Sequence, residues 1–235
     1  MKSLWNSFKI AFAMFSKIPM PQADWSEENM RYMLCFFPFV GAAVGVVMLG
    51  MEWLCRYFGM SNGFIAVALV LVPVIVTGGI HVDGLLDTSD ALSSWRDREK
   101  RLEILKDSHA GAFAVITACV YFLTMYGGMS QIVEQDNRKM LYILATGYIT
   151  LPKANASGTV AEFSRKAQDT RVRNILIIYL VLLTGFMFWI QPVWGTAVIV
   201  TALLVFWFYR HKALKYFGGT TGDLSGYFLC LCEVW

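Results

Sequence analysis

The sequence predicts an all-α fold: a polytopic integral membrane helical bundle of about six to seven spans, with an additional N-terminal helix at the membrane interface. Hydrophobic residues make up 57% of the 235-residue chain, and the mean hydropathy is +0.52. Charged residues make up only 16%, against roughly 25% in soluble domains. Apolar segments recur from end to end at close to the ~20 residues that cross a bilayer. We therefore expect a single integral membrane domain over residues 1–235.

The N-terminal helix is predicted from two stripes of different character. The polar stripe holds Lys2, Asn6, Lys9 and Ser16. The aromatic residues lie elsewhere on the helix and are Trp5, Phe8, Phe12 and Phe15. Such a pattern is typical of an amphipathic helix lying in the membrane interface. Pro19 and Pro21 are expected to end it.

Six candidate spans follow, and a shorter apolar segment comes last. The candidate spans are residues 32–54, 64–80, 111–133, 140–156, 175–190 and 193–209. The fourth carries Pro152, Lys153 and Asn155, which indicates a polar, broken helix end that faces the protein interior. The last segment, 224–235, is too short to cross a bilayer squarely, because a span needs about 20 residues.

Lysines and arginines are distributed unevenly between the two sides of this bundle. Seventeen lie in the N-terminal segment and in the stretches 81–110, 153–173 and 210–223, which the predicted spans put on one side. The other side holds Arg56, Arg138 and Lys139. The positive-inside rule predicts that the rich side is cytoplasmic, in a bacterial or archaeal cytoplasmic membrane. The net charge of +3 and the absence of a basic tail give no indication of a nucleic-acid partner.

The first candidate site is a group of three carboxylates directly after an uncharged apolar run. Asp83, Asp87 and Asp90 are spaced i, i+4, i+7 and share one face if the helix continues. Like charges this close to a membrane edge repel one another, so we expect a cation among them. Oxygen ligands suit Mg²⁺ or Mn²⁺, which commonly bind through a few carboxylates plus substrate phosphates. The alternative is a solvated helix end, although Gly78-Gly79 would allow unwinding or close backbone approach.

A second cluster, before the third predicted span, and His81 at the start of the acidic motif extend the candidate site. Lys106 and Asp107 precede the third predicted span, where Asp107 could complete a metal pair. A helix N-cap by Asp107 or Ser108 is the alternative reading of that cluster. His81 is the first residue of the acidic motif and is a candidate base or phosphate ligand. A purely structural role for this histidine fits the sequence equally well.

A third cluster, a Gly/Thr-rich turn over residues 217–223, precedes the last apolar segment. Gly219, Thr221 and Asp223 could offer backbone N–H groups, a hydroxyl and an acid to a ligand. Arg165 could pair with phosphates, although membrane topology explains it equally well. Clustered carboxylates, cations and such a turn at a membrane surface favour metal-dependent phosphoryl transfer on a diphosphate-bearing substrate.

Three motifs, in this order and spacing, resemble the cobalamin synthase family of adenosylcobinamide-GDP ribazoletransferases. They are GGIHVDGLLDTSDAL, LEILKDSHAG and FGGTTGD, and the segments SKIPMP and FFPFVGAAVG fit the same family. The resemblance implies an enzyme that joins α-ribazole, or its 5′-phosphate, to adenosylcobinamide-GDP and releases GMP. It implies Mg²⁺ as the cofactor and a place at the membrane, with the two substrates and lipid as partners. A homo-oligomer is left open.

Residue roles follow from the motifs and this resemblance together. The expected metal ligands are Asp83, Asp87, Asp90 and Asp107. The expected catalytic residues are His81, Asp83, Lys106 and Asp107. The expected substrate-binding residues are Gly219, Thr221, Asp223 and Arg165.

Two other functions fit parts of the sequence less well. A CDP-alcohol-type phosphotransferase also uses spaced aspartates, but its D-x-x-D-G-x-x-A-R run is not matched, because Gly84 follows the first aspartate here. A cation transporter would carry acids near the bilayer midplane on several spans and would show repeat symmetry. The acids of this chain instead gather at one predicted membrane face, without a repeat.

Overall fold

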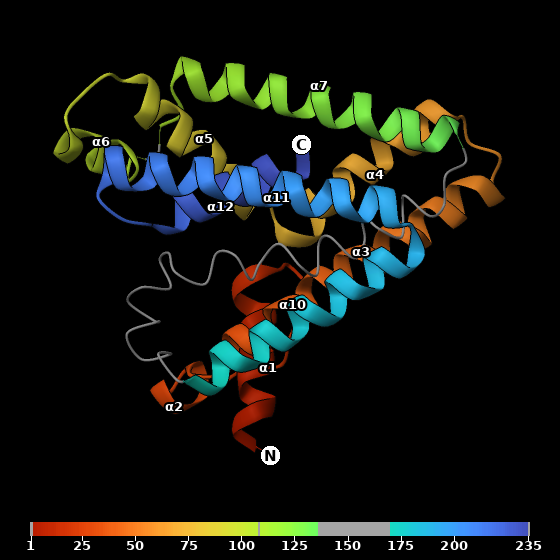
Figure 1. Ribbon diagram of the computed structural model, residues 1–235, viewed down its shortest axis with the longest axis horizontal. Helices are drawn as coiled ribbons and strands as arrows, with labels where there is room; N and C mark the ends of the chain where they lie inside the picture. The colour runs from red at the N-terminus through yellow and green to blue at the C-terminus, as the bar shows by residue number, and fades with distance from the viewer. Residues whose placement is uncertain (1, 108, 136–169, 235) are drawn as a thin grey trace.

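The computed structural model describes residues 2–107, 109–135 and 170–234, and the regular structure in these ranges is helical throughout (Figure 1). The helices before the gap are α1 (Lys2–Phe15), α2 (Glu27–Met30), α3 (Met33–Tyr57), α4 (Asn62–Thr77), α5 (Ile80–Ser93), α6 (Arg98–Ile104) and α7 (Ala112–Glu134). Those after it are α10 (Thr170–Ile190), α11 (Pro192–Lys212), the π-helical turn η2 (Ala213–Phe217) and α12 (Gly222–Val234). The all-α prediction is confirmed for this part of the chain.

Four helices are long and apolar enough to cross a membrane: α3, α7, α10, and α11 extended by η2. They correspond to the predicted spans 32–54, 111–133, 175–190 and 193–209. The predicted span 140–156 lies outside the described residues. The segment 224–235 forms α12, whose 13 residues are too few for a span. The described residues therefore give four spans, or five with the bent pair below, and the predicted six to seven are not confirmed.

The predicted span 64–80 is interrupted by a sharp bend. Helix α4 ends at Thr77, and α5 leaves it at 91°. Gly78 and Gly79 make the bend with φ of 70° and 77°, a left-handed conformation that residues with a Cβ rarely adopt. The acidic motif thus does not continue the apolar helix but starts a separate helix, α5. The sequence alone is compatible with both arrangements.

The N-terminal helix packs on the protein more closely than its two stripes suggest. Ile10 and Ala11 of α1 are completely buried, in a cluster shared with α3 and α10. Lys9 of the expected polar stripe is buried, and its ammonium donates a hydrogen bond to the carbonyl of Gln22 at 2.8 Å. The helix ends at Phe15, before the two prolines, as expected. Its position at the membrane interface stays a prediction.

Helix α12 lies in the middle of the bundle, next to α5, α7 and α11 (Figure 1). Leu224, Phe228 and Cys230 on this helix are completely buried. Helix α10, in contrast, is mostly exposed along its apolar length, as expected of a surface that faces lipid. Helix α6, the start of α7 and the end of α11 lie at one end of the molecule (Figure 1). The fold therefore brings the acidic motif and the Gly/Thr turn to one end.

Candidate functional site

Helix α5 and the first turn of α12 form the centre of the candidate site, and two glycines let them touch. A Cβ atom built on Gly84 would lie 2.5 Å from the carbonyl oxygen of Asp223. A Cβ atom on Gly226 would lie 2.7 Å from the carbonyl oxygen of His81. Both distances are shorter than any real Cβ contact, so the two backbones approach this closely only because both positions lack a side chain.

This crossing brings together carboxylates that are about 140 positions apart in the sequence. Burial raises the pKa of Asp87, and the negative charges of Asp83, Asp223 and Asp90 raise it further. Burial raises the pKa of Asp223, and the charge of Asp83 adds to this effect, while a hydrogen bond from its own backbone N–H opposes it. We call Asp83, Asp87 and Asp223 the acid cluster. Its members form no ion pair with any lysine or arginine among the described residues.

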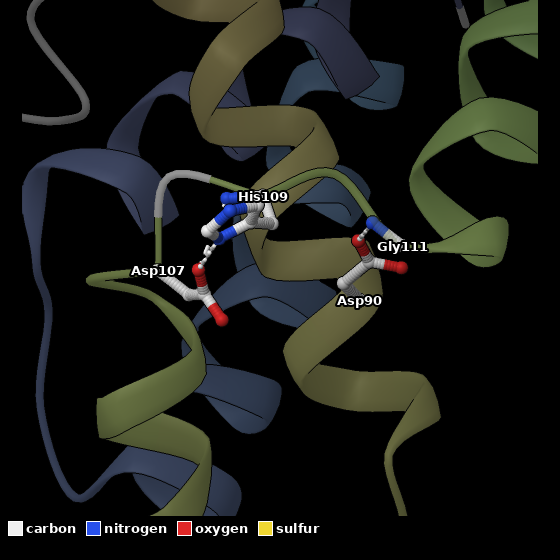
Figure 2. Close-up of polar contacts among 4 residues, drawn as sticks. All are labelled: Asp90, Asp107, His109 and Gly111. Atoms are coloured by element: carbon white, nitrogen blue, oxygen red, sulfur yellow. Dashed lines mark hydrogen bonds and ion pairs between the residues drawn. The ribbon is translucent and has the colours of Figure 1, made fainter.

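Asp90 contributes to the site in a different way from the other acids of its motif. One carboxylate oxygen accepts a hydrogen bond from the backbone N–H of Gly111 at 2.5 Å (Figure 2). The other accepts one from the backbone N–H of Ala114 at 2.8 Å. Backbone N–H groups at the start of a helix have no acceptor within the helix, and a capping side chain normally supplies one. Asp90 therefore caps α7 from a neighbouring helix. The cap considered for Asp107 is not seen, because its carboxylate is bonded to His109 instead. Ser108 lies outside the described residues.

Asp107 is paired with a residue that the sequence analysis did not single out. Its Oδ1 lies 2.7 Å from Nδ1 of His109 and 3.0 Å from the His109 backbone N–H (Figure 2). These hydrogen bonds lower the pKa of Asp107. Both side chains are exposed, on the loop between α6 and α7. The structure does not bring Asp107 into the acid cluster, and its proposed metal contact stays a prediction.

The remaining residues expected at the site lie around this centre. The His81 ring packs against the Phe37 ring of α3, with centroids 6.4 Å apart, and forms no hydrogen bond with a described residue. Lys106 is exposed at the end of α6. Arg165 lies outside the described residues.

The Gly/Thr turn caps α12 and receives an arginine from α6. The hydroxyl of Thr221 accepts a hydrogen bond from the Leu224 backbone N–H at 3.3 Å, while Gly219 is half-buried in the turn. The guanidinium of Arg98 lies directly against Gly218. The alternating charges of α6 are typical of a solvated face, so no sequence pattern indicates this contact.

Arg101, one turn along α6, is a second basic residue that the sequence analysis missed. It is buried, with its guanidinium over the Tyr216 ring at 4.5 Å, and its Nε has no hydrogen-bond acceptor among the described residues. A buried N–H donor without an acceptor is costly. Together, Arg98 and Arg101 make the side of the turn that faces α6 suitable for an anion.

The chemistry of the acid cluster fits a divalent cation that binds together with a phosphate ligand. Its three carboxylates are oxygen donors without a basic partner, which suits Mg²⁺. In the described part of the chain, however, no three acidic, histidine or cysteine side chains converge closely enough to hold a metal alone. Mg²⁺ is commonly held by one or two carboxylates plus substrate phosphates and water, and this arrangement fits that mode.

A family model described as cobalamin-5-phosphate synthase matches residues 7–235 of this sequence. This chain belongs to the cobalamin-5-phosphate synthase family. The match includes α5, the α6–α7 loop, the Gly/Thr turn and α12, so every described part of the candidate site lies within the family region.

Curated relatives support the same assignment over most of their length. An adenosylcobinamide-GDP ribazoletransferase of Lachnoclostridium phytofermentans is 40% identical, over 97% of this chain and 90% of the relative. Relatives of the same name from Clostridium botulinum Alaska E43 and Clostridium perfringens ATCC 13124 are each 30% identical, over at least 99% of this chain and 96% of the relative. No solved structure gives a significant match. The cobalamin-5-phosphate synthase family thus supplies the chemistry against which the α5–α12 site is interpreted.

Proposed function

We propose that this chain is an adenosylcobinamide-GDP ribazoletransferase, which joins adenosylcobinamide-GDP to α-ribazole or α-ribazole 5′-phosphate and releases GMP. The observation that carries the proposal is the acid cluster, which two close-packed glycines assemble from α5 and α12 in a member of the cobalamin-5-phosphate synthase family. The curated relatives carry this activity in their names.

The reaction is a phosphoryl transfer on the diphosphate of the corrinoid nucleotide. A ribose hydroxyl of ribazole attacks the phosphorus next to cobinamide, a new P–O bond forms, and the phosphoanhydride bond to GMP breaks. The hydroxyl proton passes to a carboxylate of the acid cluster, for which Asp83, the exposed member, is the best placed. Such chemistry depends mainly on positioning and on charge stabilisation.

Mg²⁺ is the proposed cofactor. One or two of the carboxylates of Asp83, Asp87 and Asp223 would hold it, together with the diphosphate and water. When bound, the ion would offset the negative charge that develops on the transferred phosphoryl group and on the leaving GMP. The basic side chains Arg98 and Lys106 would add positive charge on the α6 side. Asp90 holds the start of α7 in place and would act on the cluster through position and charge.

The site is proposed to face the cytoplasm, in a cytoplasmic membrane, because the segments that adjoin it, 94–107 and 210–217, are rich in lysine and arginine. The cation-transporter alternative is not favoured by the structure. It requires acids on several spans, whereas the acid cluster lies on α5 and α12, neither of which is long enough to be a span by itself.

GMP release from adenosylcobinamide-GDP tests the proposal directly. The full chain in lipid nanodiscs, supplied with α-ribazole or its 5′-phosphate, should release GMP with Mg²⁺ and should stop when the metal is chelated. Gly127→Ala, on the exposed side of α7 with nothing near its added Cβ, is the matched active control. Failure of the parent chain to release GMP with either acceptor would overturn the activity, and an undiminished rate under chelation would overturn the metal.

A further inference from the structure

A cavity next to the acid cluster has no role so far. It has a volume of about 550 Å³ and lies between the end of α1 and the α4–α5 bend. Small-molecule sites are commonly concave and of about 300–1,000 Å³, with mostly apolar walls and a few placed polar groups. The apolar walls here include Met14, Val74, Val82 and Leu86. Asp83 of the acid cluster lines the same cavity, so a ligand bound there can reach the reacting centre.

Lys17 provides the cation of this cavity, and its stem and backbone are fixed in place. The Lys17 backbone N–H donates a hydrogen bond to the carbonyl of Val76 at 2.8 Å, which joins the end of α1 to the end of α4. The carbon chain of Lys17 lies directly against Gly78. Lys17 is exposed and lines the cavity, and its ammonium group forms no ion pair with an acidic side chain among the described residues.

The arrangement therefore offers an ammonium, an apolar wall and a carboxylate within one cavity. A ligand that matches all three carries an anionic group, a flat apolar ring system and a hydroxyl. Adenosylcobinamide-GDP is much larger than the cavity, whereas a phosphorylated aromatic nucleoside is of the right size. We infer that this cavity binds the ribazole substrate, with Lys17 holding its 5′-phosphate and Asp83 facing the attacking ribose hydroxyl, so that Lys17 makes α-ribazole 5′-phosphate the preferred acceptor.

This inference rests on the proposed function and refines it, because it selects between two acceptors that differ only in the 5′-phosphate. Lys17 is accordingly a specificity-determining residue. A phosphate of a lipid headgroup offers the same chemistry to an ammonium at a membrane edge, and the experiment is designed to separate the two sources.

The test compares the parent with Lys17→Met, which keeps the length of the stem and removes the charge. The kcat/KM of GMP release is measured with each acceptor in nanodiscs of zwitterionic lipid and again with anionic lipid. With the phosphorylated acceptor, Lys17→Met should lose about 10-fold to 100-fold, the usual effect of one charge-assisted hydrogen bond, mostly in KM. With α-ribazole it should stay within about 2-fold, and Lys17→Arg should restore most of the preference.

Lys100→Met is the matched control, because Lys100 is an exposed lysine paired with Glu103 on α6 and takes no part in the cavity. It should leave both acceptors unchanged. Equal losses with the two acceptors, an effect that follows the lipid charge, or no loss at all would each overturn the role of Lys17.

Equilibrium dialysis of radiolabelled α-ribazole 5′-phosphate against parent and Lys17→Met provides a readout that needs no turnover. The parent should bind it at least 10-fold more tightly than Lys17→Met. Equal binding would contradict the inference while GMP release by the parent still supported the proposed function. Absence of GMP release with a retained binding difference would contradict the function and leave the cavity assignment standing.

Discussion

At the scale of single residues, the acids of one short motif have different tasks. Asp83 and Asp87 join Asp223 in a cluster without a basic partner. Both carboxylate oxygens of Asp90 instead accept hydrogen bonds from the backbone of α7. Spacing along a helix could not separate these tasks, because it places all three acids on one face. What separates them is the neighbouring element that each one meets, which no local pattern records.

The capping role of Asp90 predicts that Asp90→Asn lowers the free energy of unfolding and has little effect on the affinity for Mg²⁺. An amide has a single acceptor oxygen, so one N–H at the start of α7 would lose its partner, at a cost of about 0.5–2 kcal/mol in the free energy of unfolding. Thermal unfolding without Mg²⁺ should report this loss, while the Mg²⁺ concentration for half-maximal GMP release should change less than in Asp83→Asn. A large rise in the Mg²⁺ requirement without loss of stability would instead make Asp90 a metal ligand.

The raised pKa of Asp223 predicts a gain of stability when its charge is removed. Between the ordinary Asp pKa and the raised one, the folded protein binds more protons than the unfolded chain, so stability decreases as pH rises. In metal-free buffer, Asp223→Asn should therefore raise the thermal midpoint at neutral pH, and the gain should vanish as pH falls below the ordinary Asp range. GMP release should fall 10-fold to 100-fold or more, as for loss of a metal-supporting contact. A lower midpoint at neutral pH would contradict this account.

At the scale of elements, the crossing of α5 and α12 depends on the absence of two side chains. Gly84→Ala would place its Cβ against the Asp223 backbone and push the two helices apart, which costs about 1–3 kcal/mol, as overpacking in a close-packed interior does. The separation should also reduce GMP release. Gly127→Ala on α7 has nothing within 4 Å of its Cβ and should be neutral or slightly stabilising. Equal behaviour of the two variants in thermal unfolding and turnover would argue against a tight crossing.

Long apolar helices and motif residues could be predicted from the sequence, and long-range pairings could not. The helices α3, α7, α10 and α11 agree with predicted spans because apolar length alone identifies a span. The glycine pair before the acidic motif was noted, but a 91° bend at that point depends on tertiary packing. In the same way, the approach of Asp223 to Asp83 was expected only from a shared function, and the contacts of Asp90, Arg98 and Lys17 had no sequence signal.

At the scale of the whole molecule, α6, the start of α7 and the end of α11 lie at the end opposite the α3–α4 turn (Figure 1). Trp95, 90% exposed before α6, and Met60, 45% exposed in that turn, mark the two ends. In a background without the native cysteines, Met60→Cys should react with an impermeant maleimide added to intact cells. Trp95→Cys should react only after the membrane is opened. Labelling of position 95 from outside would reverse the proposed orientation.

The most direct test of the central claim, that α5 and α12 build one phosphoryl-transfer site, is a double-mutant cycle of Asp83→Asn and Asp223→Asn. GMP release is titrated with Mg²⁺ for the parent, both single variants and the double variant. One shared site predicts that each single variant loses turnover and needs more Mg²⁺, and that the double variant loses much less than the product of the two losses. A common site would be contradicted if the loss of turnover in the double variant equals the product of the two single losses and the Mg²⁺ requirement is unchanged.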